Sequence, residues 1–344
     1  MAILSYINYA SATAAIVATI IVRVLYHGIS FKPTRESSLL KKLVRSVCRG
    51  QLLLRQYLFW PTVYLARVFY AFQRQDPLLR ISKLDPVTVV CISDTHNTYP
   101  EVPDGYVLVH AGDLSKSGTF EQIQETLTWL NSLPHEHKIV VAGNHDILLD
   151  PTLDIQNPNI DAESLRAKLN WGNIIYLQDT ATDITCSNGR KLKIYGSPKS
   201  KDFGSPNQAF QYPASQDVWH RSIPSRADIL VTHCPPRAHL DMLSVGCNYL
   251  LKELWRVWPR LHVFGHCHDG HGTQRLMFDD FQSKYEQIVI NNGGIRRLLW
   301  MFEDLVRSWR KHQPGPPLPW THLVNAASAD GFFDKRKPAI KVVI

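Results

Sequence analysis

The stretch Lys138-Ile-Val-Val-Ala-Gly-Asn-His-Asp146 joins an apolar run to a polar end. Residues 138–142 are rich in β-branched apolar side chains, which predicts a buried strand. A glycine ends the run, and Asn144 and His145 follow at once. Loops at strand ends hold functional side chains on a rigid scaffold. The stretch therefore predicts a strand whose carboxyl end carries chemistry.

Four other predicted strand ends carry the same kind of polar segment. These segments are Asp94-Thr-His96, Gly112-Asp113, Thr232-His233 and Gly265-His266-Cys-His268. Just past a strand, side chains two residues apart can converge on one point. Carboxylate, imidazole and amide ligands together suit Mn²⁺, Fe or Zn²⁺ better than Ca²⁺. The combination predicts a metal centre built from several strand ends.

Between these ends the chain has the pattern of a strand-rich α/β (α+β) domain. Strands are predicted at 87–92, 106–111, 138–142, 174–177, 191–195, 228–232, 262–264 and 287–290, with further apolar runs at 323–326 and 340–344. Helices are predicted at 120–133, 163–169, 247–257 and 295–309, with Asp161 as an N-cap. The pattern predicts one large domain over residues 86–344.

Composition excludes several classes of protein. The chain has 344 residues, of which 44% are hydrophobic, so it is not a disordered chain, and six cysteines exclude a small disulfide-built fold. The net charge of +8 is unevenly placed: residues 1–80 hold eleven Lys or Arg and two acidic residues. The remainder holds 27 basic and 28 acidic residues. Nucleic acid is therefore not required to explain the charge.

Residues 2–22 contain no charged side chain, which is long enough for a helix across a bilayer. We expect a transmembrane anchor over residues 1–25, with a cleavable targeting segment or a buried core helix as the alternatives. The basic residues follow the apolar run. Because Lys and Arg favour the cytoplasmic side, this placement predicts a single-pass, membrane-anchored protein with its catalytic domain in the cytosol.

For two other segments, the sequence is compatible either with contact with a membrane or with packing on the domain. Residues 26–85 form a basic, amphipathic segment, and 51–72 mixes aromatic residues with arginines. This mixture suits a helix in the headgroup region or a helix packed on the catalytic domain. Residues 293–320 read as a helical and Pro-rich insertion. Its amphipathic helix at 295–309 is expected to pack on the domain, with membrane contact as the alternative.

The ordered set of motifs resembles the calcineurin-like metallophosphoesterase superfamily over about residues 86–292. Within it, the chain is similar to the metallophosphoesterase-domain-containing proteins. The motifs that carry this likeness are Ser93-Asp-Thr-His96, His110-Ala-Gly-Asp-Leu-Ser115, Gly143-Asn-His-Asp146, Ile194-Tyr-Gly-Ser-Pro198, Thr232-His-Cys-Pro-Pro236 and Gly265-His-Cys-His268. The resemblance implies a β-sandwich flanked by helices, with two metals at one end.

The resemblance also implies roles for individual residues. A first metal (Mn, Fe or Zn) would be held by Asp94, His96, Asp113 and His268, and a second by Asp113, Asn144, His233 and His266. Asp113 would bridge the two metals, and a metal-bridging hydroxide would attack phosphorus in line. Asn144 and His145 would contact the substrate. His145 would stabilise the developing charge or protonate the leaving oxygen.

One departure from the family bears on the substrate. In the protein-phosphatase branch, the Gly-Asp motif continues to a second Asp and an Arg, whereas here Leu114-Ser115-Lys116 follows Asp113. The usual partner of His145 and the phosphate-binding Arg are therefore missing. We expect hydrolysis of phosphodiesters or small phosphomonoesters. The alternatives are a Ser/Thr protein phosphatase and a weakly active protein that uses the fold for binding or scaffolding.

Overall fold

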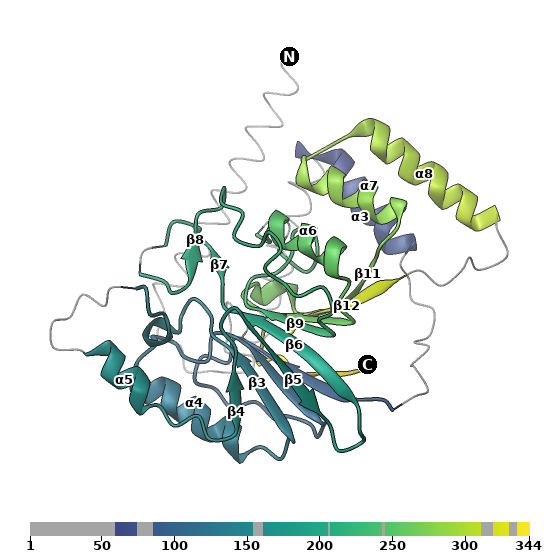
Figure 1. The fold of residues 1–344 in the computed structure, drawn as a ribbon. Helices are drawn as coiled ribbons and strands as arrows, with labels where there is room; N and C mark the ends of the chain where they lie inside the picture. The colour runs from purple at the N-terminus through teal and green to yellow at the C-terminus, as the bar shows by residue number, and fades with distance from the viewer. Residues whose placement is uncertain are drawn as a thin grey trace, which may run out of the picture.

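Two β-sheets lie face to face at the centre of the molecule (Figure 1). The computed structural model describes residues 59–73, 85–153, 161–205, 207–242, 245–310, 319–329 and 336–344. The first sheet has the order β13 (Ile340–Val343), β1 (Thr88–Ile92), β2 (Val107–Ala111), β3 (His137–Val141) and β4 (Ile174–Tyr176). Its strands β1 to β4 run parallel, and β13 pairs antiparallel with β1.

The second sheet repeats this arrangement with more strands. Its order is β11 (Gly272–Met277), β12 (Trp320–Asn325), β10 (Leu261–Phe264), β9 (Ile229–Thr232), β6 (Lys191–Ser197) and β5 (Thr180–Thr185). The four central strands are parallel, and the two edge strands pair antiparallel. Parallel strands end at the same edge of their sheet, so both sheets present a row of carboxyl ends.

The main core lies between the two sheets. Val89 and Val109 from the first sheet meet Val231 and Val263 from the second, and all four are fully buried. Every residue of β2, β9 and β10 is buried, because helices cover the outer faces of both sheets. This double burial explains why these strands read as unbroken apolar runs rather than as alternating ones.

Helices flank the sandwich on both sides. On the first sheet, α4 (Phe120–Ser132) buries Ile123, Leu127 and Leu130, and α5 (Ala162–Lys168) lies beside it (Figure 1). On the second sheet, α6 (Asn248–Val257) buries its apolar face. Asp161 caps α5, as predicted, by accepting a hydrogen bond from the backbone N–H of Ser164. The mixed α/β fold with two sheets and flanking helices confirms the expected fold class.

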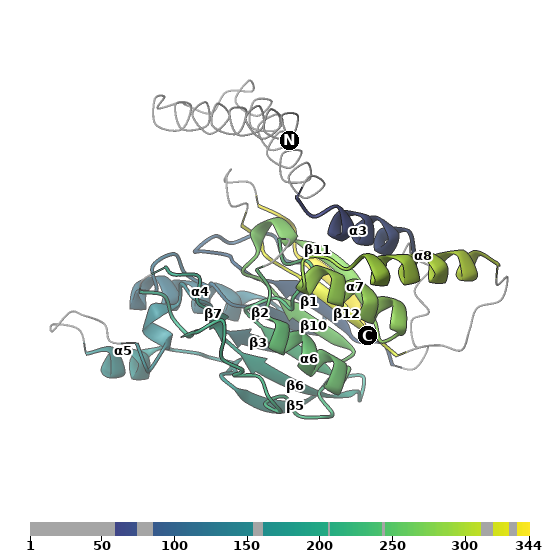
Figure 2. The ribbon, with the colours of Figure 1, turned by 90° about the horizontal axis from the view of Figure 1, so that it is seen from above.

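A group of three helices packs beside the second sheet. It consists of α7 (Asp280–Ile290), α8 (Ile295–Arg310) and α3 (Pro61–Gln73), which lie together in both views (Figures 1 and 2). Tyr70 of α3 stacks on Tyr285 of α7, with 4.1 Å between ring centroids, and its hydroxyl donates to Gln282 Oε1. Of the two alternatives for residues 51–72, the described part, α3, is thus a helix packed on the catalytic domain.

The predicted strand at residues 287–290 is wrong, because these residues form the last turn of α7. A short apolar run does not by itself distinguish a strand from a buried helix. The helix begins earlier, at Asp280, and is capped by Asp279, whose carboxylate accepts a hydrogen bond from the backbone N–H of Gln282. The apolar residues Ile288 and Val289 then face α3 and α8.

The expected single-pass membrane anchoring needs correction. Among the described helices, none combines the length and the apolar character needed to cross a bilayer. The longest, α8, has 16 residues and extends about 24 Å, short of the roughly 30 Å hydrocarbon core, and it carries charged residues. The anchor predicted for residues 1–25 lies outside the described residues, so the division into 1–25, 26–85 and 86–344 stays a prediction.

Candidate metal centre

The seven predicted ligands gather at the carboxyl ends of five strands from both sheets. Asp94 and His96 follow β1, Asp113 follows β2, Asn144 follows β3, His233 follows β9, and His266 and His268 follow β10. The two rows of parallel strand ends lie at the same end of the sandwich, which brings these side chains together. Four of them are also buried: Asp94, Asp113, Asn144 and His233.

The backbone turns sharply at several of these positions. Asp94, Asp113 and His266 have φ values of 53°, 55° and 65°, in the left-handed region that non-glycine residues rarely adopt. Two glycines make room for the carboxylates. A Cβ on Gly265 would lie 2.1 Å from Asp94 Oδ2, and a Cβ on Gly143 would lie 2.3 Å from Asp113 Oδ1. Strain of this kind persists where packing enforces it, which is typical of functional sites.

A first group of side chains forms around Asp94. His268 Nε2 lies 3.1 Å from Asp94 Oδ1, and the ring of His96 lies 5.5 Å from that of His268. One ligand atom from each of these three residues lies within 4.8 Å of the other two. His96 Nε2 also lies 3.7 Å from Asp113 Oδ2.

A second group forms on the other side of Asp113. His233 Nε2 lies 3.5 Å from Asp113 Oδ2 and 2.9 Å from Asn144 Oδ1. His266 Nδ1 lies 2.8 Å from the same amide oxygen. Asp113 is thus adjacent to both groups. The donor set of carboxylate oxygens, imidazole nitrogens and an amide oxygen fits divalent transition metals.

The comparison with known proteins agrees with this geometry. The family model for calcineurin-like phosphoesterases matches residues 87–270. This range contains all seven predicted ligands, from the first sheet and from the second. This chain belongs to the calcineurin-like phosphoesterase family. The family assignment confirms the resemblance drawn from the motifs, and it covers more than half of the chain.

Relatives of this chain have varied names. It is 39% identical to human metallophosphoesterase domain-containing protein 1 over an alignment of 210 positions, and the match covers 54% of this chain and 61% of that protein. It is 34% identical to the UPF0046 protein C25E10.12 of Caenorhabditis elegans, over 54% of this chain and 70% of that one. It is 40% identical to the "Probable rhamnogalacturonate lyase C" of Emericella nidulans, over 80% of this chain. The match spans only about a quarter of that protein, at 26%.

The charges of the cluster reinforce one another. Burial raises the pKa of Asp94, but the hydrogen bond and charge of His268 outweigh it, so the pKa of Asp94 falls below its usual value. The pKa of Asp113 is lowered in the same way, mainly by His233. Burial lowers the pKa of His233, yet the Asp113 carboxylate raises it to about 9. Both carboxylates are therefore ionised near neutral pH, as metal binding requires.

His145 lies at the open side of the cluster. Its backbone N–H donates to Asp113 Oδ1 over 2.9 Å, and its Nδ1 lies 2.9 Å from the carbonyl oxygen of Lys116. A carbonyl oxygen only accepts, so Nδ1 carries a proton and donates it. The other ring nitrogen, Nε2, is left for a ligand. The Lys116 carbonyl thus accepts a hydrogen bond from the His145 ring, in a chain that lacks the carboxylate partner expected for it.

Asp146, the last residue of the quoted motif, ties two of the ligand-bearing loops together. Its carboxylate is fully buried and accepts hydrogen bonds from the backbone N–H groups of Leu114, Ser115 and Gly143, at 2.8–3.1 Å. It also accepts one from the Ser115 hydroxyl. The motif contains Asp146 and Gly143, but nothing in the sequence indicates the bonds to Leu114 and Ser115, because these residues lie about 30 positions away.

Phe203 is a residue at the site that the sequence did not single out. Its ring stacks on His266, with 5.8 Å between centroids and an angle of 20°, and 48% of the side chain is exposed. The ammonium group of Lys201 lies 4.8 Å from the centre of the same ring. Both side chains belong to the connection between β6 and β9.

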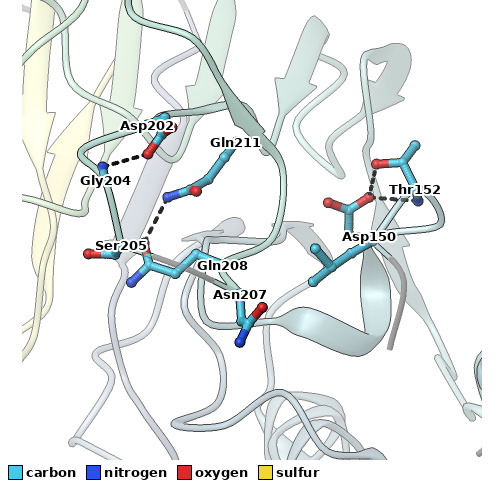
Figure 3. Close-up of a pocket in the computed structure, with 9 residues that line it drawn as sticks. Asp150, Thr152, Asp202, Gly204, Ser205, Asn207, Gln208 and Gln211 are labelled. Atoms are coloured by element: carbon cyan, nitrogen blue, oxygen red, sulfur yellow. Dashed lines mark hydrogen bonds between the residues drawn. The ribbon is translucent and has the colours of Figure 1, made fainter. Parts of the chain in front are cut away.

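The same loop borders a polar pocket of about 410 Å³ (Figure 3). The pocket is lined by Asp150, Thr152, Leu153, Asp202, Gly204, Ser205, Asn207, Gln208 and Gln211. In Figure 3, Asp202 accepts a hydrogen bond from Gly204, and Gln211 donates to Gln208. The backbone N–H of Ala209 donates to the carbonyl oxygen of Asn144 over 2.9 Å. The loop that lines the pocket is therefore hydrogen-bonded, through Ala209, to the backbone of a predicted ligand.

Proposed function

We propose that this chain is a two-metal phosphoesterase that hydrolyses phosphodiesters or small phosphomonoesters. The observation that carries the proposal is the convergence of side chains from both sheets on Asp113, whose Oδ2 lies 3.7 Å from His96 Nε2 and 3.5 Å from His233 Nε2. Asp94, His96, Asp113 and His268 would hold a first metal, and Asp113, Asn144, His233 and His266 a second. Two divalent metals activate water and neutralise phosphate charge in such sites.

The remaining roles belong to the residues on the open side. The Lys116 carbonyl orients His145 so that Nε2 faces away from Lys116. In that orientation, His145 would donate a proton to the leaving oxygen or stabilise charge on the phosphate. Asn144, whose amide oxygen faces His233 and His266, would fix the position of the substrate beside the second metal.

The neighbourhood of the cluster supports an ester with an organic substituent. Phe203 offers an exposed apolar ring next to His266, and Lys201 places a positive charge beside it. The protein-phosphatase alternative lacks both its second Asp and its phosphate-binding Arg after Asp113. We therefore favour diesters or small monoesters over phosphoproteins as substrates.

The test uses the full chain loaded with Mn²⁺ and two chromogenic esters. Bis-p-nitrophenyl phosphate reports on diester hydrolysis and p-nitrophenyl phosphate on monoester hydrolysis. We expect turnover of the diester at the higher kcat/KM. Turnover of the monoester and of phosphopeptides only would favour the phosphatase alternative, and bound metal without any turnover would favour a binding protein.

Asp113→Ala is the sharpest variant of this test. Because Asp113 is adjacent to both groups of ligands, its loss should remove both metals and abolish turnover. Asp183→Ala, at an exposed position on β5, is the matched control and should behave as the wild type. Full metal content and full turnover in Asp113→Ala would contradict the proposed function.

A further inference from the structure

Two buried histidines hydrogen-bond threonines that lie next to predicted metal ligands. Thr95 stands between Asp94 and His96, and its Oγ1 lies 2.9 Å from His110 Nε2. Thr232 directly precedes His233, and its Oγ1 lies 2.8 Å from His262 Nε2. The same pair of side chains, in the same relation to a ligand, thus occurs in each sheet.

The two pairs are built in the same way. His110 is on β2, and its neighbour in the parallel strand β1 is Ile92, three residues before Thr95. His262 is on β10, and its neighbour in the parallel strand β9 is Leu230, two residues before Thr232. In both cases a histidine within one strand hydrogen-bonds a threonine at or just past the carboxyl end of the neighbouring strand. All four side chains are fully buried.

The hydrogen bonds have a defined direction. Thr232 Oγ1 donates to the carbonyl oxygen of Cys234 over 2.7 Å, and Thr95 Oγ1 is 3.4 Å from the carbonyl oxygen of Leu114. A hydroxyl that donates its one proton to a carbonyl still accepts through its lone pairs. Each histidine therefore donates from Nε2–H to the threonine. Burial lowers the pKa of His110 to about 4 and that of His262 to about 3, so both rings are neutral.

Holding these rings in the interior carries a cost. Within the part of the chain that the structure describes, Nδ1 of His110 and Nδ1 of His262 have no hydrogen-bond partner. A buried, unpaired polar atom is unfavourable, and an apolar ring of similar shape would avoid it. The hydrogen bond to the threonine is the feature that a phenyl ring could not replace.

The segment after β1, which accepts the hydrogen bond from His110, has a backbone conformation that its surroundings must stabilise. After β1 the chain adopts left-handed backbone conformations at Asp94, His96 and Asn97, with φ of 53°, 45° and 56°. Such conformations persist only where the surroundings enforce them. Thr95 lies in the middle of this segment, and its side chain is the one that His110 holds.

We propose that His110 and His262 are positioning residues that hold the two halves of the metal centre, acting through Thr95 and Thr232. The inference rests on the proposed metal-dependent function. His110 secures the segment that carries Asp94 and His96, and His262 secures the segment that carries His233. Their effect is on metal affinity, because each ring bonds a threonine beside predicted ligands and is not itself one of those ligands.

The test measures Mn²⁺ binding to the full chain, by titration with electron paramagnetic resonance detection of free Mn²⁺. We expect His110→Phe and His262→Phe to weaken Mn²⁺ binding about tenfold or more, the range found when groups that orient metal ligands are removed. His110→Gln and His262→Gln place an amide N–H near the position of Nε2–H and should restore most of the affinity.

His135→Phe is the matched control. His135 is also buried, has an unpaired Nδ1, and bonds the carbonyl oxygen of Pro103 through Nε2. It precedes β3, at the opposite end of that strand from Asn144. Its replacement should lower the melting temperature but leave the Mn²⁺ dissociation constant within about twofold.

A double-mutant cycle separates the proposed bond from general loosening. Thr95→Val keeps the shape of the side chain and removes the hydroxyl, so it should weaken Mn²⁺ binding as His110→Phe does. Combined with His110→Phe, it should add little. Additive losses, equal losses in His135→Phe, or unchanged affinity in both Phe variants would overturn the inference. A wild-type chain that binds no Mn²⁺ would instead overturn the proposed function itself.

Discussion

At the scale of single residues, Asp113 uses its two carboxylate oxygens differently. Oδ1 accepts the backbone N–H of His145 over 2.9 Å, whereas Oδ2 faces His96 and His233. One oxygen therefore positions the proposed proton donor, and the other faces the proposed metals. Asp146 also uses both of its carboxylate oxygens, which together accept four hydrogen bonds from the loops that carry Asp113 and Asn144.

This network predicts the effect of Asp146→Asn. The amide has one acceptor oxygen, and its NH₂ group would face backbone N–H donors, so buried donors would lose their partner. We expect a loss of about 1–3 kcal/mol in the free energy of unfolding and weaker metal binding. Thermal unfolding and Mn²⁺ titration measure the two effects.

Asp161→Asn is the control for that substitution. Asp161 accepts the N-cap hydrogen bond of α5, from Ser164, and asparagine caps helices about as well as aspartate. This variant should unfold and bind metal as the wild type does. If Asp146→Asn also matched the wild type in both measurements, the network around Asp146 would have no role in holding the ligand loops.

At the scale of elements, the site is built from strand ends and from one long connection between two strands. The ends of β1, β2, β3, β9 and β10 supply the predicted ligands, and regular hydrogen bonding within the sheets sets their spacing. The connection between β6 and β9 contains the short parallel pair β7 (Ser200–Lys201) and β8 (Gln211–Tyr212). Between them, the chain reaches back to the site and places Phe203 on His266.

Phe203→Ala tests whether this connection contacts the substrate. An aromatic pair contributes about 0.5–1.5 kcal/mol, so we expect KM for bis-p-nitrophenyl phosphate to rise about 2- to 10-fold. The value of kcat should change little, because the contact would form equally in the ground state and the transition state. Phe203→Tyr should keep the wild-type KM, and a fall in kcat at constant KM would contradict a binding role.

At the scale of the whole molecule, the packing of the two sheets against each other brings the predicted ligands together. Each sheet contributes about half of the cluster, and the apolar core between the sheets holds the two halves in register. The sheets also each contain a buried, neutral histidine, His110 in the first and His262 in the second. This burial ties the stability of the molecule to pH.

The pH dependence has a definite sign. In the unfolded chain these histidines take up protons below about pH 6.5, whereas in the folded chain they do so only near pH 4 and pH 3. The unfolded state therefore binds more protons between these values. We expect the free energy of unfolding to fall as the pH falls below 6.5, by about 1.4 kcal/mol per pH unit for each histidine.

Urea unfolding of the chelator-treated chain at pH 7, 6 and 5 measures this slope. His262→Phe removes one of the buried histidines that take up protons on unfolding and should give a shallower decrease between pH 6 and pH 5. His137→Phe removes a partly exposed histidine and serves as the control. A wild-type slope in His262→Phe would show that His262 is not held neutral by burial.

Much of the site follows from local pattern. The β-branched runs before Asp94, Asp113 and Asn144 predict buried strands, and the structure confirms them as β1, β2 and β3. Polar residues at such strand ends predict convergence because parallel strands finish at one edge. The same reasoning failed at residues 287–290, where an equally short apolar run belongs to a helix that starts at Asp280.

Residue types and local periodicity indicate which side chains could bind metal and where along the strands they stand. What holds those side chains in place became visible in the folded molecule. Three of the contacts at the site join positions distant in sequence: the hydrogen bond between His145 and the Lys116 carbonyl, the stacking of Phe203 on His266, and the hydrogen bond between His262 and Thr232. Such contacts arise when two sheets pack through a shared core, and packing has no local signature in the chain.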